Sequence, residues 1–154
     1  GRSGVGANDV RSVPEAREGV EEMARILYVE GDAQKARMLG PLLEQRGHEV
    51  EVVNCAERAM LKMHANEKYE AMVLQLFLPG MDGAALCRWL EKGSGPGTVR
   101  KLAFTWHGHR VPVDTSKGLP RWLPVDRLLE NVQEVAELAD AVEAMLSDPG
   151  PDEQ

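Results

Sequence analysis

The fold is decided by the stretch Leu74-Gln75-Leu76-Phe77-Leu78-Pro79-Gly80-Met81-Asp82-Gly83. It completes an apolar run, 71–74, that ends at the polar Gln75, and strands buried on both faces have such nearly continuous apolar sequences. The Pro-Gly pair marks a turn, and Asp82 is suited to cap a helix. The stretch therefore predicts a buried strand, a tight loop and a helix in succession.

The same succession of strand and helix recurs on both sides of this stretch. Apolar runs predict five strands, at 26–29, 48–53, 71–75, 101–105 and 125–129. Helical spacing predicts four helices, at about 32–46, 54–66, 82–90 and 131–146. Alternating strands and helices with apolar strands predict a parallel sheet that helices cover on both faces, an α/β fold.

Polar residues and glycines set the expected limits of the helices. Asp32 is placed to cap the first helix, and Gly47 to end it. We expect Asn54-x-x-Glu57 and Asn131-x-x-Glu134 to act as capping boxes for the second and last helices. The glycine-rich segment 93–97 is expected to be a flexible loop.

Composition limits the domain organisation and the class of protein. The 154 residues suit one domain, with a flexible leader at 1–23, a folded unit at 24–147 and a flexible acidic tail at 148–154. Because the chain begins with Gly1, we expect it to be an excised piece that leaves room for further modules. No apolar run approaches a membrane span, and no signal peptide is visible.

Charge and cysteine spacing exclude further classes. The net charge is −7, from 18 basic and 25 acidic residues, which argues against a general nucleic-acid binder. Cys55 and Cys87 are far apart and lack metal-site spacing, so we expect two reduced thiols rather than a disulfide or a zinc site. Together these features predict a cytoplasmic protein.

The L-P-G-M-D-G sequence at 78–83 resembles the receiver domain of bacterial two-component response regulators, and the resemblance extends over about residues 25–147. It implies the flavodoxin-like (CheY-like) three-layer sandwich, with a five-stranded parallel sheet in the order 2-1-3-4-5. Strand ends would then bring Glu30, Gln75, Thr105 and Glu130 around one shallow crevice.

In that family, the position of Gln75 is the aspartate that accepts a phosphoryl group from a histidine kinase. Two acidic residues that help to bind Mg²⁺ correspond to Glu30 and Gly31, so one carboxylate is missing here. Thr105 matches a hydroxyl residue that contacts the phosphoryl group. Glu130 stands in place of a lysine, followed by Asn131 in place of a proline. The resemblance therefore implies a degenerate phosphorylation site.

The altered residues remove the expected chemistry. The neutral amide of Gln75 is a poor nucleophile, and one carboxylate is a weak basis for holding Mg²⁺. Glu30 and Glu130 without a lysine should repel a phosphate. We expect no catalytic residue, metal or cofactor. Gln75 is expected either to bond loop amides or to be a plain filler, and Glu130 to be a solvated carboxylate at the start of the last helix.

The segment between the fourth and fifth strands is the candidate partner surface. Three prolines and two glycines within 106–124 predict a shortened or missing fourth helix. Residues 100–127 carry six Arg or Lys and two Asp, whereas residues 131–154 carry seven acidic residues and no basic one. Exposed aromatic residues beside arginines are typical of interaction sites. The predicted partner-binding residues are Trp106, Arg110, Lys117, Arg121, Trp122 and Arg127.

An alternative for this segment is that both tryptophans pack under the loop and replace the lost helix. Arg127 occupies the position of the family's switch aromatic, which argues against the usual phosphorylation-coupled rotation. His107-x-His109 is weak support for a metal site.

The leading hypothesis is a non-enzymatic, phosphorylation-independent receiver-like module that binds protein partners in bacterial signal transduction, with a homodimer as one option. The first alternative is a receiver that is phosphorylated at a displaced residue, Asp32 or Asp82. The second is a small-ligand or nucleotide-binding flavodoxin-like domain, which no glycine-rich phosphate loop supports.

Overall fold

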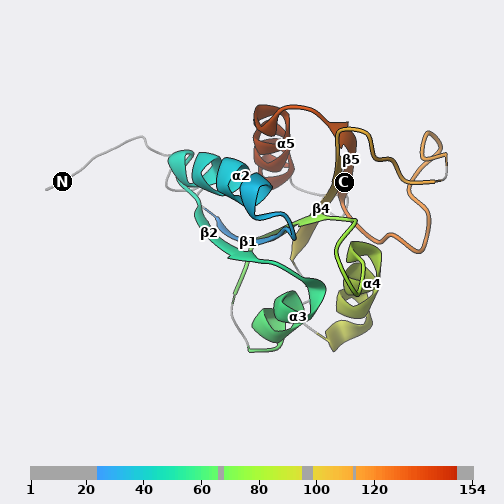
Figure 1. Ribbon diagram of the computed structural model, residues 1–154. Coiled ribbons are helices and arrows are strands. Elements are labelled where there is room, and N and C mark those ends of the chain that lie inside the picture. Colours follow the sequence, from blue (N-terminus) through green and yellow to red (C-terminus); the bar gives the residue numbers. More distant parts are fainter. Residues whose placement is uncertain (1–23, 66–67, 95–98, 113, 149–154) are drawn as a thin grey trace, which may run out of the picture.

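The protein folds around a five-stranded, all-parallel sheet in the order β2-β1-β3-β4-β5 (Figure 1). The computed structural model describes residues 24–65, 68–94, 99–112 and 114–148. The strands are β1 (Arg25–Val29), β2 (Glu49–Val53), β3 (Ala71–Gln75), β4 (Arg100–Trp106) and β5 (Arg127–Val132). The helices are α2 (Ala33–Gln45), α3 (Ala56–His64), α4 (Gly83–Trp89), which continues as the π-helical turn η1 (Leu90–Ser94), and α5 (Val135–Ser147). The predicted flavodoxin-like, receiver-type fold is confirmed.

Two hydrophobic clusters, one on each face of the sheet, form the core. Successive residues of β1 alternate between them, with Leu27 and Val29 on the face of α3 and α4, and Ile26 and Tyr28 on the face of α2 and α5. All four side chains are fully buried. The apolar sequence of β1 is thus explained by burial on both sides, as expected for a central parallel strand.

Of the four predicted N-caps, two are present and two are wrong. Asp32 Oδ1 accepts the amide of Gln34 at 2.9 Å, and Asp82 Oδ1 accepts the amide of Ala85 at 2.8 Å. The expected box at Asn54 does not form, because the N-cap of α3 is Cys55, without a side-chain cap. The expected box at Asn131 fails because Asn131 still belongs to β5.

The last helix is instead capped at Glu134, whose amide donates to Glu137 Oε1 at 3.2 Å. The boundaries of β5 also differ from the prediction of 125–129. Leu129 of β5 pairs with Phe104 of β4, and Val132 pairs with Trp106, so β5 carries one more residue than β4 between these pairs. This bulge includes Asn131, whose φ of 59° is in the left-handed region.

The described residues between β4 and β5 are 107–112 and 114–126, and none of them is helical. This confirms the expected loss of the helix that follows the fourth strand; the element labelled α4 is the helix between β3 and β4. Two apolar residues of this loop fill the space: Val111 and Leu123 are buried in the cluster beneath α3 and α4. Residues 93 and 94 end η1, and the rest of the predicted flexible segment at 93–97 lies outside the described residues. So do the predicted leader and, apart from Asp148, the predicted tail.

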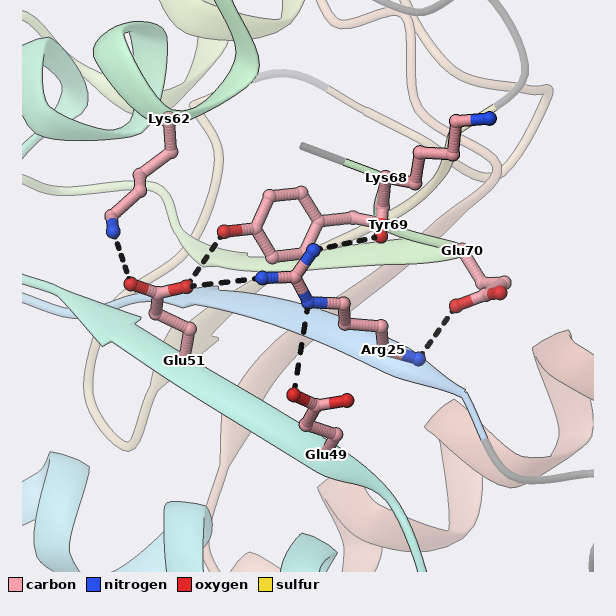
Figure 2. Close-up of polar contacts among 7 residues, drawn as sticks. All are labelled: Arg25, Glu49, Glu51, Lys62, Lys68, Tyr69 and Glu70. Carbon is pink, nitrogen blue, oxygen red and sulfur yellow. Dashed lines mark hydrogen bonds and ion pairs between the residues drawn. The ribbon is translucent and has the colours of Figure 1, made fainter. Parts of the chain in front are cut away.

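A charged network, shown in Figure 2, joins β1 and β2 to the segment before β3 at the amino ends of the strands. The Arg25 guanidinium lies 4.7 Å from the centre of the Tyr69 ring, and its Nη2 lies 3.8 Å from Glu51 Oε1. Glu51 also accepts a 2.8 Å hydrogen bond from the Tyr69 hydroxyl and pairs with Lys62 of α3. These partners, Lys62 first, hold the pKa of Glu51 below its ordinary value.

Both cysteines are free thiols, as expected. Burial raises the pKa of Cys87 to about 12, so its thiol stays protonated at neutral pH. Among the helices that the structure describes, none has the length and apolar character needed to span a bilayer.

Candidate functional site

The predicted crevice lies where parallel strands end. Glu30 directly follows β1, and Gln75 is the last residue of β3. Thr105 is the last residue but one of β4, and Glu130 lies within β5. The structure gives each of them hydrogen-bond partners, but these partners come mainly from neighbouring loops. Thr105 is joined to Asn131, and Glu30 to Trp106, whereas Gln75 bonds only within its own loop.

Glu30 is buried, with 1% of its surface exposed, and its carboxylate is hydrogen-bonded through both oxygens. Oε1 accepts the Tyr28 hydroxyl at 3.0 Å and the Trp106 indole N–H at 2.8 Å. Oε2 accepts the Asp32 amide at 3.1 Å. Three donors offset the cost of removing this carboxylate from water. The one family carboxylate that remains is therefore already satisfied by the protein.

Tyr28 is a site residue that the sequence analysis missed. Burial, followed by the charge of Glu30, raises the pKa of its hydroxyl above the ordinary value, so Tyr28 remains a donor. A signal was available, because residues two apart on a strand face the same side of the sheet, and Tyr28 and Glu30 are two apart. The contact with Trp106, 76 residues away, had no such signal.

Trp106 is buried, so the prediction that it is an exposed partner-binding residue is wrong. Its ring packs edge-on against Phe104 with the centroids 4.9 Å apart, and Lys35 Nζ lies 4.9 Å from its centre. These contacts place the indole over Glu30, with a cation on its outer face. The alternative in which the tryptophan packs inward holds for Trp106 but not for Trp122, which is 38% exposed.

Gly31 lies close to Pro79 of the loop after β3. A Cβ at this position would lie 3.0 Å from Cδ of Pro79, which is closer than ordinary van der Waals contact. A side chain at position 31 would therefore require the Pro79 ring to shift by a few tenths of an ångström. The second acidic residue of the family's pattern would meet this contact here.

Gln75 is turned onto its own loop. Its Oε1 accepts the Phe77 amide at 2.5 Å, and its Nε2 donates to the Phe77 carbonyl at 2.9 Å. This confirms the expectation that Gln75 bonds a loop amide. The same loop needs Gly83, because a Cβ there would lie 3.1 Å from Cα of Leu76. The Gln75 side chain thus stabilises the turn from β3 into α4.

The loop between β4 and β5 is held by hydrogen bonds to Thr105, Glu130 and Asn131. The Thr105 hydroxyl donates to the His109 carbonyl at 2.6 Å and accepts the Asn131 amide at 2.8 Å. Glu130 Oε2 accepts the Val111 amide at 2.5 Å, and Asn131 Oδ1 accepts the Gly108 amide at 2.7 Å. Glu130 is therefore a partly buried loop anchor, and the expectation of a solvated helix-start carboxylate is wrong.

The acidic side chains around this site accept main-chain amides. Within the residues that the structure describes, no three His, Cys, Asp or Glu side chains are placed to hold a metal ion. The two alternative phosphoacceptors, Asp32 and Asp82, are N-caps whose Oδ1 atoms already accept main-chain amides. The polar groups of the crevice act on the protein's own backbone.

The loop 107–126 displays most of the predicted partner residues. Arg110, Lys117 and Arg121 are exposed, and the Trp122 carbonyl is held at 2.9 Å by Arg88 of α4. Arg127 differs from the others, because it is half-buried in β5 and pairs with Asp148. We call the exposed set Arg110, Lys117, Arg121 and Trp122 the basic loop surface.

Comparisons with known proteins agree with this fold. No protein-family model matches the chain. The transcriptional regulatory protein TcrA of Mycobacterium tuberculosis is 34% identical over 68 residues, which are 44% of this chain and 26% of TcrA. The DNA-binding response regulator MtrA of Mycobacterium leprae is 35% identical over 81 residues, 53% of this chain and 36% of MtrA. The chain thus spans about a quarter to a third of the length of these relatives.

Solved structures match over more of the chain. A putative response regulator from Chloroflexus aurantiacus has a TM-score of 0.66 and 26% identity, over 82% of this chain and 99% of that one. The receiver domain of a Syntrophus aciditrophicus signal transduction histidine kinase has a TM-score of 0.67 and 25% identity, over 83% and 93%. The fold and these matches make the chain similar to receiver domains of response regulators.

Proposed function

We propose that this receiver domain works without aspartyl phosphorylation, as a non-enzymatic module that binds a protein partner. The observation that carries the proposal is the state of Gln75, whose amide bonds the main chain of Phe77 through both polar atoms. An amide oxygen is a poor nucleophile toward phosphorus, and this one is already accepting a hydrogen bond.

The rest of the crevice supports the same proposal. Glu30 lies beneath the indole of Trp106, Pro79 fills the space next to Gly31, and Glu130 brings a negative charge where the family has a lysine. A phosphoryl group would meet two carboxylates, neither of which is paired with a basic side chain among the described residues, and this costs energy in a partly buried site. The displaced acceptors Asp32 and Asp82 are disfavoured by their roles as helix caps.

We propose that the partner binds the basic loop surface and the remaining exposed part of the loop 107–126. Asn131, Thr105 and Glu130 hold main-chain groups of residues 108, 109 and 111, and Arg88 holds the Trp122 carbonyl. These parts of the loop therefore need little ordering when a partner binds. Arginines beside an exposed tryptophan are frequent at the centre of interfaces. Residues inherited from a phosphorylation site would thereby hold a binding loop in place.

Phosphorylation is tested by incubating the protein with acetyl phosphate and Mg²⁺ and measuring its intact mass. A receiver domain with the complete set of carboxylates and lysine serves as the positive control. We expect no phosphate adduct on this protein and none on Gln75→Asp, because the variant still lacks the second carboxylate and the lysine. A stoichiometric adduct on the unaltered protein would overturn the proposal, and its loss in Asp32→Asn or Asp82→Asn would identify a displaced acceptor.

The proposed partner surface is tested by affinity capture of partners from the native organism. We expect a charge reversal of Arg110, Lys117 and Arg121 to abolish recovery of a partner that the unaltered protein retains. Arg46→Glu, at the C-cap of α2, reverses a single charge outside the loop and should retain that partner. Equal recovery with all three proteins would place the binding surface elsewhere.

A further inference from the structure

The outer edge of β2 offers main-chain groups to an incoming strand. β2 is an end strand of the sheet. The Glu49 amide donates to the Ala24 carbonyl and the Val53 carbonyl accepts the Glu30 amide, both at 2.9 Å, so these two residues face β1. Successive residues of a strand direct their N–H and C=O groups to opposite sides. Val50 and Val52 therefore direct theirs outward, where no described strand pairs with them.

A groove runs along this edge. It has a volume of about 690 Å³ and lies between α2 and α3, which flank β2 in Figure 1. On the α2 side of the groove, Gly40 and Pro41 carry no long side chain that would close it. A Cβ on Gly40 would lie 3.7 Å from Cγ2 of Val52. Val52 is 43% exposed and forms an apolar patch on that side. The groove is therefore open to an extended chain with small apolar side chains.

Two arginines face the groove from opposite walls. Arg37 of α2 and Arg58 of α3 are exposed, and neither forms an ion pair within the described residues. Both arginines lie in the first half of their helices. Each helix begins near the carboxyl end of the strand that precedes it. Toward the amino end of β2, the charge of Glu51 is matched by Lys62 (Figure 2). Among the residues that line the groove, Glu44 is the one exposed carboxylate without a described ion pair. Glu30 also lines the carboxyl half, but its carboxylate is buried and already accepts three hydrogen bonds. The exposed charges of this half are therefore those of Arg37 and Arg58.

A second copy of the chain fits this edge poorly. Two-fold pairing of β2 with its own copy would bring Glu49 or Glu51 close to the same residues of the other chain, and like charges on neighbouring strands are destabilising. An acidic segment of another protein can instead place its carboxylates toward the carboxyl half of the groove, at Arg37 and Arg58 and away from Glu49.

We propose that the groove along β2 binds an extended, acidic segment of a partner protein, which adds to the sheet as a sixth strand. Main-chain groups of Val50 and Val52 hold its backbone, and Arg37 and Arg58 bind its carboxylates. This site is separate from the basic loop surface, because β2 and β5 are opposite edges of the sheet.

The probe is a fluorescein-labelled ten-residue peptide in which pairs of valines alternate with pairs of glutamates, so that glutamates face both walls of the groove. The matching valine and lysine peptide is the charge control. We expect saturable binding of the glutamate peptide, and binding of the lysine peptide that is weaker by roughly tenfold or more. In NMR titrations the amide signals of Val50 and Val52 should shift more than those of Glu49 and Glu51. Equal binding of the two peptides, or the largest shifts in the loop 107–126, would overturn the proposal.

Variants test the backbone and the arginines separately. Val52→Pro removes an outward N–H, which an edge strand tolerates, and should abolish binding, whereas Val52→Thr keeps the N–H and should bind normally. Arg37→Glu with Arg58→Glu should weaken binding of the glutamate peptide by roughly tenfold.

Arg110→Glu with Arg121→Glu, both on the basic loop surface, is the matched charge control and should leave peptide binding unchanged. If Val52→Pro unfolds, as circular dichroism would show, the arginine variants decide the question. Full affinity in the double arginine variant would exclude this site.

Discussion

The two ends of the sheet use charged residues in different ways. At the amino end, Arg25, Glu51 and Lys62 pair with one another across strands and a helix at the surface (Figure 2). At the carboxyl end, Glu30 and Glu130 bond to N–H and O–H donors of the protein and to no described basic side chain. Exposed ion pairs contribute little to stability, whereas buried hydrogen-bonded carboxylates fix the positions of what surrounds them. The carboxyl end is therefore where substitutions should matter most.

The largest effect is expected for Trp106→Ala. The change removes a buried aromatic ring and one donor to Glu30, so the free energy of unfolding should fall by about 3–5 kcal/mol. Urea unfolding followed by circular dichroism measures it. The control is Trp122→Ala, which should cost less than about 1 kcal/mol because that ring is 38% exposed. Similar losses in the two variants would contradict the burial of Trp106 over Glu30.

Thr105→Val should have the next largest effect. The variant keeps the shape of the side chain but leaves the Asn131 amide and the His109 carbonyl without their partner, at a cost of about 1–3 kcal/mol. Hydrogen exchange should speed up at the amides of Gly108, Val111 and Asn131. Thr115→Val, in the same loop, is the control, since no described hydrogen bond uses its hydroxyl. Unchanged exchange in Thr105→Val would show that the loop is held by other contacts.

Gly31→Ala tests the filled space beside Pro79. The added methyl group should lower the free energy of unfolding by about 1–2 kcal/mol, because it overpacks two adjoining loops. Gly40→Ala makes the same chemical change inside α2, where the new Cβ finds ordinary contact, and should raise stability by up to about 1 kcal/mol. Urea unfolding distinguishes the two. A stable Gly31→Ala protein would mean that the loops can separate to admit a side chain.

The smallest effect is expected at the amino end, for Glu51→Gln. The folded-state pKa of Glu51 is lowered, so its contribution is present above the ordinary glutamate pKa of about 4.3 and is lost as the pH falls through the folded value. The variant should therefore be less stable than the parent at pH 7, by less than about 1 kcal/mol, and the difference should shrink as the pH falls below the ordinary glutamate pKa. Unfolding curves across this range measure it. A difference that grows on acidification would contradict the sign.

The sequence predicted the strands and helices that have an unbroken local pattern. The apolar runs of β1 and β3 are buried on both faces, and Asp32 and Asp82 accept the amides expected of N-caps. These features depend on residues that are close in the chain, so a local pattern contains the necessary information. The receiver-type fold follows from their order.

The errors arose where a distant contact overrides local preference. Asn131 has the side chain of a helix cap, but β4 pairing draws it into a bulge, where it bonds Gly108. The tryptophan at 106 is flanked by a basic loop, yet it turns inward to a carboxylate 76 residues earlier in the chain. Neither partner is visible in a periodicity, because both depend on how the loop after β4 folds back over the sheet.

The bulge in β5 also predicts how this domain tolerates a change in length. If Asn131 were deleted, Leu129 and Val132 would occupy alternate positions of a regular strand and would still face the same side of the sheet. The two hydrogen bonds of Asn131, to Thr105 and from Gly108, both serve the neighbouring loop. The extra residue is thus a spacer for the loop rather than for the sheet. A protein shortened by this single codon should keep its architecture and lose the fixed position of the segment that follows β4.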